Sequence, residues 1–175
     1  MSKKALVVIA LKGFQDHELA GTVKGLEAAG FKCTICGKEK SSHCAGKFGA
    51  HAETTVAMRD VKVEDYDRMT FIGGPGARAL AEEPDAIALA KRFYDAGKIV
   101  GAICISPMVL AAAGLLKGKR ATVWDSKSGH GPEAQFLKEH GATFVPELPV
   151  VVDLPFVTAN GPDAADEFGR TLAMV

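Results

Sequence analysis

The sequence lacks an excess of charge of either sign. Its 175 residues carry 21 Lys and Arg against 21 Asp and Glu. A nucleic-acid-binding protein presents a clustered basic surface, and binding to an anionic membrane needs a group of Lys and Arg side chains. The charge balance therefore argues against nucleic acid and against a membrane surface as partners.

Cysteine is also scarce, with four residues in the chain. Small disulfide-stabilised proteins are short and dense in cysteine, so we expect free thiols in a reducing compartment. Cys33 and Cys36 are three residues apart in an expected strand, where their side chains point to opposite faces. No second Cys/His pair completes a zinc site. We therefore expect no metal and no cofactor.

Long uninterrupted apolar runs are absent. The run at 5–11 ends at Lys12-Gly13 without the cleavage site of a signal peptide. The run at 99–116 is marginal for a bilayer, which needs about 20 residues, and Ser106-Pro107 interrupts it. We expect buried core segments and a cytoplasmic protein.

What is present is ordinary globular composition, with 47% apolar and 24% charged residues. The length is typical of one domain, here 1–175. Apolar runs bounded by turn residues alternate with segments of helical spacing. The predicted strands are Ala5–Leu11, Phe31–Cys36, Met69–Ile72, Lys98–Ile103, Arg120–Trp124, Phe144–Pro146, Val150–Val152 and Phe156–Thr158. The predicted helices are Gln15–Ala29, Pro84–Ala96, Pro107–Ala113, Glu133–His140 and Asp163–Met174.

This alternation predicts an α/β fold with a mostly parallel sheet covered by helices on both faces. Residues 37–68 show only weak periodicity, and we expect short irregular elements there. The two short strands at 144–146 and 150–152 are expected to pair with each other. Ligands of such sheets bind at the carboxyl ends of the strands, so the residues that follow each strand are the candidates for function.

The strongest local feature is Gly101-Ala-Ile-Cys104-Ile-Ser-Pro107. An apolar strand ends at Cys104, and a helix begins within about three residues, which is typical of a nucleophile elbow. The N–H groups and dipole of a helix N-terminus favour a thiolate. The alternative is that Cys104 is a small buried core residue, as free cysteines often are.

Two further features follow neighbouring strand ends. The loop Gly73-Gly-Pro-Gly76 exposes backbone N–H groups, and those of Gly74 and Ile105 are candidates for an oxyanion hole. Glu18 lies in the first turn of the first helix, next to His17. The alternatives are a plain tight turn for the glycine loop and a contribution to the helix dipole for Glu18.

Together these residues resemble the ThiJ/PfpI superfamily, which includes a deglycase, glyoxalase-type enzymes and intracellular proteases. The resemblance rests on the segments 14–19, 72–76, 102–107, 114–123 and 158–162, and it extends over nearly the whole chain. It implies a flavodoxin-like three-layer sandwich, a nucleophilic Cys104 in contact with Glu18, and a homodimer or higher homo-oligomer.

The chain departs from the family pattern where a histidine is expected. The protease branch has His directly after the nucleophile, and this chain has Ile105. The deglycase branch has His after the next strand, and Trp124 falls there. No matched position supplies a general base, so His17 and His130 are the candidates, by location alone.

Physical chemistry constrains the Cys104–Glu18 pair. An ionised carboxylate would raise the pKa of a neighbouring thiol, so the useful arrangement is a protonated Glu18 donating to a thiolate, with burial raising the carboxyl pKa. The resulting hypothesis is a cysteine enzyme of glyoxalase or deglycase type that acts on small carbonyl compounds. The alternatives are a redox- or stress-sensing protein without turnover and a PfpI-like hydrolase or hydratase.

Overall fold

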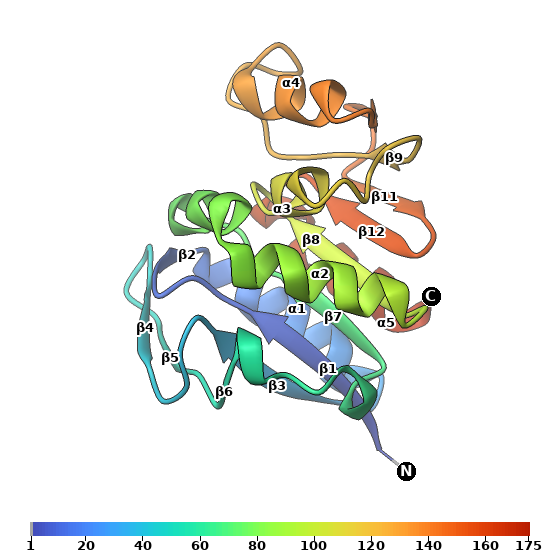
Figure 1. The fold of residues 1–175 in the computed structure, drawn as a ribbon. Coiled ribbons are helices and arrows are strands. Elements are labelled where there is room, and N and C mark those ends of the chain that lie inside the picture. Colours follow the sequence, from blue (N-terminus) through green and yellow to red (C-terminus); the bar gives the residue numbers. More distant parts are fainter. Residues whose placement is uncertain (1) are drawn as a thin grey trace.

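The computed structural model of the protein describes residues 2–175. Its central sheet has seven strands in the order β11-β12-β8-β7-β1-β3-β6 (Figure 1). In chain order these strands are β1 Lys3–Val8, β3 Phe31–Gly37, β6 Val56–Ala57, β7 Arg68–Phe71, β8 Ile99–Ile103, β11 Val150–Asp153 and β12 Phe156–Ala159. All neighbouring pairs are parallel except β11 with β12.

Helices cover both faces of this sheet (Figure 1). α1 (Asp16–Ala28) and α5 (Ala165–Met174) pack together on one face, and α2 (Pro84–Asp95) and α3 (Pro107–Ala112) lie on the other. The remaining helix, α4 (Pro132–Glu139), packs against α3 on the side away from α2. The predicted three-layer α/β fold is confirmed. Within residues 2–175, no helix is both long enough and apolar enough to cross a bilayer.

The helices on both faces of the sheet explain why its strands are continuous apolar runs. The side chains from Ala5 to Ile9 are buried, because helices cover both sides of β1, and such strands lack an alternating polar face. α1 and α5 approach closely through glycine: a Cβ at Gly25 would lie 2.4 Å from the carbonyl carbon of Gly169. The two helices therefore cross nearly backbone to backbone.

Two small sheets extend the core. One contains β2 (Lys12–Phe14), β4 (His43–Gly46) and β5 (His51–Glu53), and the other pairs β9 (Arg120–Ala121) with β10 (Thr143–Phe144). The 3-10 segments are η1 Met58–Asp60, η2 Val63–Asp65, η3 Pro75–Glu82 and η4 Pro162–Ala164.

Two predictions in the last third of the chain are wrong. The strand expected at 120–124 is confined to Arg120–Ala121, because β11 occupies the position beside β12, and the Thr122 N–H donates to the Thr158 hydroxyl instead. The expected pairing of 144–146 with 150–152 does not occur. β10 pairs with β9, while β11 pairs with β12, to which a two-residue turn connects it directly.

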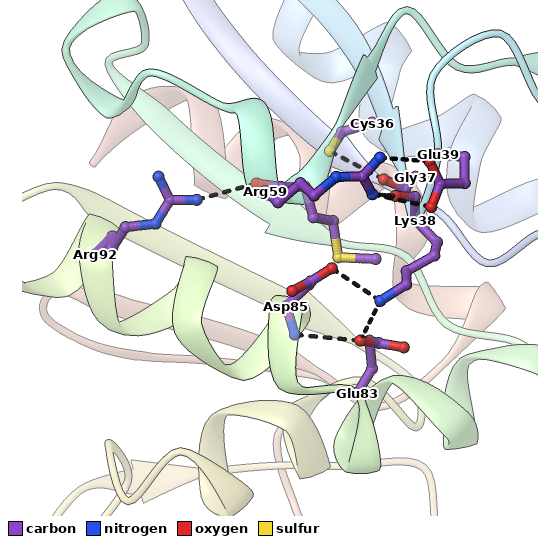
Figure 2. Close-up of polar contacts among 9 residues, drawn as sticks. Cys36, Gly37, Lys38, Glu39, Arg59, Glu83, Asp85 and Arg92 are labelled. Atoms are coloured by element: carbon purple, nitrogen blue, oxygen red, sulfur yellow. Dashed lines mark hydrogen bonds and ion pairs between the residues drawn. The ribbon is translucent and has the colours of Figure 1, made fainter.

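Charged side chains hold the end of β3 against the start of α2 (Figure 2). Lys38 Nζ lies 2.7 Å from a Glu83 carboxylate oxygen and 2.8 Å from one of Asp85. Arg59 makes a two-pronged contact with Glu39 nearby. Exposed pairs contribute about 0–1 kcal/mol each, so this network orients the surface segments and adds little stability.

Candidate active site

Cys104 lies in the turn between β8 and α3, and its backbone adopts a left-handed conformation with φ 66°. A non-glycine residue in this region costs about 1–2 kcal/mol. The surrounding backbone holds it there: its N–H donates to the Ala159 carbonyl, and its carbonyl accepts from the Trp124 N–H, both at 2.8 Å. The Ser106 hydroxyl also donates to the Ile72 carbonyl at 2.7 Å. The turn is thus a strained strand-to-helix elbow.

Glu18 is fully buried in the first turn of α1. Its Oε1 accepts from the Gly73 N–H at 3.0 Å, and its own N–H donates to Gln15 Oε1 at 2.9 Å. Its Oε2 is also buried and has no hydrogen-bond partner within residues 2–175. A buried polar atom without a partner costs about 1–3 kcal/mol. Such an atom needs an explanation, and catalysis is one.

Gly73 lies between the sulfur-bearing residue and the carboxyl group. A Cβ at Gly73 would be 2.4 Å from Cys104 Cβ and 2.6 Å from Glu18 Oε1. The glycine therefore lets three segments, from β7, β8 and α1, meet at one point. The structure brings together Cys104, Glu18 and the glycine loop, as the sequence indicated.

Gly73→Ala should consequently destabilise the protein, because the added methyl group also falls 2.7 Å from the Ile103 carbonyl oxygen. We expect a loss of about 1–3 kcal/mol in the free energy of unfolding, measured by urea denaturation. Gly114→Ala is the control, since its Cβ would meet nothing within 4 Å, although φ 75° adds strain. Because backbone strain alone acts at Gly114, a loss at Gly73 smaller than the loss at Gly114 would contradict the close packing at Gly73.

The candidate oxyanion-hole groups also lie at this point. The N–H groups of Gly74 and Ile105 face the Cys104 sulfur, and each lowers the pKa of the thiol. Gly74 has φ 105°, and a Cβ there would lie 2.4 Å from the Gly13 carbonyl oxygen. Only glycine fits this position, which orients its N–H toward the sulfur.

Burial controls the ionisation of the pair. It raises the pKa of Glu18 to about 7. Burial first, and then the Glu18 charge, raise the pKa of the Cys104 thiol to about 12, and the two N–H groups do not offset this. The raised carboxyl pKa agrees with the sequence-based expectation, but the thiol pKa is high where a thiolate was expected. Above about pH 7 the pair holds one proton, on the sulfur, and the carboxylate is a base beside it.

A cavity of about 180 Å³ opens above the sulfur. Its lining residues are Gln15, Lys47, Gly74, Pro75, Cys104, Ile105, Trp124 and Pro162. Ligand pockets are commonly about 300–1,000 Å³, so this one fits a small molecule. Trp124 is 39% exposed and also borders a second cavity of about 300 Å³.

The two candidate histidines lie elsewhere. His17 is exposed on α1, with its ring 5.8 Å from that of Phe48, and His130 is exposed in the loop before α4. Neither lines the cavity. Among the residues that the structure describes, the sulfur thus has a carboxylate neighbour, and no imidazole lines its cavity. Within residues 2–175, no group of three His, Cys, Asp or Glu side chains is arranged to hold a metal ion.

Lys47 is a cavity residue that the sequence did not indicate, whereas Gln15 and Pro162 lie in segments that it singled out, though without a role of their own. Lys47 follows β4, in the part of the chain where periodicity was weakest. Gln15 caps α1, and a polar residue before a helix carries a signal for capping only. Pro162 follows β12, so the rule that ligands bind at strand ends was the one available signal.

A thiol on a strained elbow, a buried carboxyl group beside it and converging backbone N–H groups lie together in this α/β protein. The chain belongs to the DJ-1/PfpI family, whose sequence model matches residues 3–174.

Relatives cover nearly the whole chain. A Methanocaldococcus jannaschii protein of unassigned function is 40% identical over 95% of this chain and 78% of its own length. Bacillus subtilis YraA, whose given name proposes a cysteine protease, is 32% identical over 97% of this chain and 96% of its own. A ThiJ/PfpI domain protein from Brachyspira murdochii superposes with a TM-score of 0.90 at 26% identity, covering 98% and 95% of the two chains. Drosophila melanogaster DJ-1beta gives 0.86 at 27%, covering 99% and 89%.

Proposed function

We propose that the protein is a cofactor-independent enzyme of glyoxalase or deglycase type, which converts small reactive carbonyl compounds through Cys104. One observation carries this proposal: the buried, unpartnered carboxylate oxygen of Glu18 lies beside a strained thiol at the base of a small cavity. A pKa of about 7 for Glu18 is near the value at which a general base works best at neutral pH. The proposed setting is the cytoplasm, with the chain as a homodimer or larger homo-oligomer.

The reaction on a 2-oxoaldehyde starts with attack of the Cys104 sulfur on the aldehyde carbon while Glu18 accepts the thiol proton. The N–H groups of Gly74 and Ile105 stabilise the negative oxygen, which then takes the proton to give a hemithioacetal. Glu18 next moves a proton from the former aldehyde carbon to the adjacent carbon, while the hydroxyl proton passes from the first oxygen to the second, which leaves a 2-hydroxyacyl thioester. Water hydrolyses the thioester and restores the thiol. The sum is 2-oxoaldehyde plus water to 2-hydroxy acid, without an external oxidant or reductant.

Purified protein without added cofactor should convert methylglyoxal to lactate over many turnovers. The assay follows methylglyoxal by derivatisation and lactate by chromatography, with protein alkylated at Cys104 as the control. Consumption of no more than one equivalent of methylglyoxal, with no lactate formed, would show a covalent adduct in place of catalysis.

A second candidate is a redox-sensing protein that uses the same thiol without turnover. The absence of histidine from the cavity lining favours it, whereas the raised thiol pKa disfavours it, because sensor thiols ionise easily. Mild peroxide followed by mass spectrometry separates the two. Selective oxidation of Cys104 in a protein that does not consume methylglyoxal would support the sensor.

A further inference from the structure

We infer that Lys47 makes the Cys104 cavity selective for electrophiles that carry a negatively charged group, with a carboxylate as the matching chemistry. For the natural reaction this inference rests on the proposed function. The substrate class would then be 2-oxoaldehydes with a short carboxylate-bearing tail, in preference to uncharged ones.

The charge of the cavity lining is the first observation. Lys47 is its one permanently charged side chain, and no Asp or Glu belongs to it. Glu18 is fully buried and does not belong to the lining. Within residues 2–175, Lys47 forms no ion pair, and its Nζ lies 5.1 Å from the centre of the exposed Phe48 ring. A positive charge that no carboxylate of the described chain pairs therefore belongs to the lining of a cavity that contains Cys104.

The position of Lys47 is built into the fold. Its N–H donates to the Phe14 carbonyl at 2.8 Å. The Asp16 carboxylate accepts from the N–H groups of Phe48 at 3.0 Å and Ala50 at 2.8 Å. These bonds attach the turn between β4 and β5 to the start of α1, the helix that carries Glu18. The backbone of Lys47 is thus held in a fixed relation to the reacting pair.

The remaining lining suits the middle of such a molecule. Pro75, Trp124 and Pro162 offer apolar surface in the same lining as the sulfur and the lysine. A compound such as 4,5-dioxopentanoate would place its aldehyde at Cys104, its short methylene chain against this surface and its carboxylate at Lys47. Methylglyoxal lacks the last contact, so it would use only part of the cavity.

Alkylation of Cys104 tests the inference without requiring turnover. Iodoacetate and iodoacetamide transfer similar groups to sulfur with loss of iodide, and they differ in charge. Peptide mass spectrometry gives the rate at Cys104 for each reagent in the parent, Lys47→Met, Lys47→Arg and Lys32→Met proteins. Lys32 is exposed at the amino-terminal end of β3. Its substitution changes the net charge by the same amount as that of Lys47, so Lys32→Met is the matched control.

We expect Lys47→Met to lower the ratio of the iodoacetate rate to the iodoacetamide rate about threefold, the size of an exposed charge interaction. Lys32→Met should leave the ratio unchanged, and Lys47→Arg should restore it. The difference in this ratio between the parent and Lys47→Met should shrink at 1 M salt, because charge interactions are then screened beyond about 3 Å. An unchanged ratio in Lys47→Met, or an equal fall in Lys32→Met, would overturn the inference, as would failure of both reagents to reach Cys104.

Turnover provides the second readout. In the parent, kcat/KM should be higher for 4,5-dioxopentanoate than for methylglyoxal, and Lys47→Met should raise KM for the first compound with little change in kcat. If the alkylation ratio responds to Lys47 but neither compound is turned over, the anion site stands and the proposed reaction fails. Suppose instead that both compounds are turned over, and that Lys47→Met changes neither the alkylation ratio nor the kcat/KM preference between the two compounds. The reaction then stands and the anion site fails.

Discussion

Cys104→Ala is expected to lower the conversion of methylglyoxal at least about a thousandfold, because the sulfur is the atom that forms the covalent bond. Stability should change little, since the sulfur is small and the hydrogen bonds that hold the turn come from backbone groups. The measurements are the steady-state rate and the urea midpoint. Parental turnover in a folded Cys104→Ala protein would end the nucleophile hypothesis.

Two control variants sharpen this result. Cys33→Ala removes a partly buried thiol on β3, and turnover should stay at the parental level. Cys104→Gly removes the nucleophile and also relieves the left-handed backbone at φ 66°. It should therefore be more stable than Cys104→Ala by about 1 kcal/mol. Equal stabilities would show that the elbow stores no strain.

The sequence was sufficient for the framework because the relevant signals are local. The apolar run at Ala5–Leu11 predicts a strand covered on both faces, and the strand that forms ends at Val8. Gly73-Gly74 and Cys104 follow strands that end at one edge of the sheet. Glu18 could be placed at the same edge because it lies in the first turn of the helix that follows the first strand. The rule that ligands bind at the carboxyl ends of strands therefore predicted that Cys104, Glu18 and the glycine loop lie together.

Properties that depend on distant segments were not accessible in this way. The high pKa of the Cys104 thiol results first from its burial in the folded chain, which no local pattern records. Lys47 reaches the cavity because Asp16, 31 residues earlier, fixes the turn that follows it. The antiparallel position of β11 depends on which edge of the sheet is free. Each of these is decided by packing across the fold.

Glu18→Gln is expected to slow turnover about 10²–10⁴-fold, the typical contribution of a general base. Gln keeps the shape and can still accept from the Gly73 N–H, but it cannot take the thiol proton. Removal of the carboxylate charge should also lower the pKa of Cys104, to which that charge contributes. The variant should therefore alkylate faster at neutral pH while turning over more slowly. If Glu18 had a purely structural role, its substitution would not make alkylation faster while making turnover slower.

The same variant should be more stable than the parent at high pH. Burial raises the pKa of Glu18 from 4.5 to about 7, so between these values the folded protein binds more protons than the unfolded chain. Stability that is present below pH 4.5 is then lost as the pH rises through about 7. At 1.36 kcal/mol for each pKa unit, the loss is up to about 3 kcal/mol. Glu18→Gln has no such group and should lack this loss.

Urea denaturation of both proteins at pH 4.5 and pH 8 measures this difference. Glu18→Gln should exceed the parent by up to about 3 kcal/mol at pH 8 and by much less at pH 4.5. Such a gain, together with the fall in turnover, would show that the carboxylate is retained for its chemistry at the expense of stability. If the variant is the less stable protein at pH 8, Glu18 belongs to the structural core and the base must be found elsewhere.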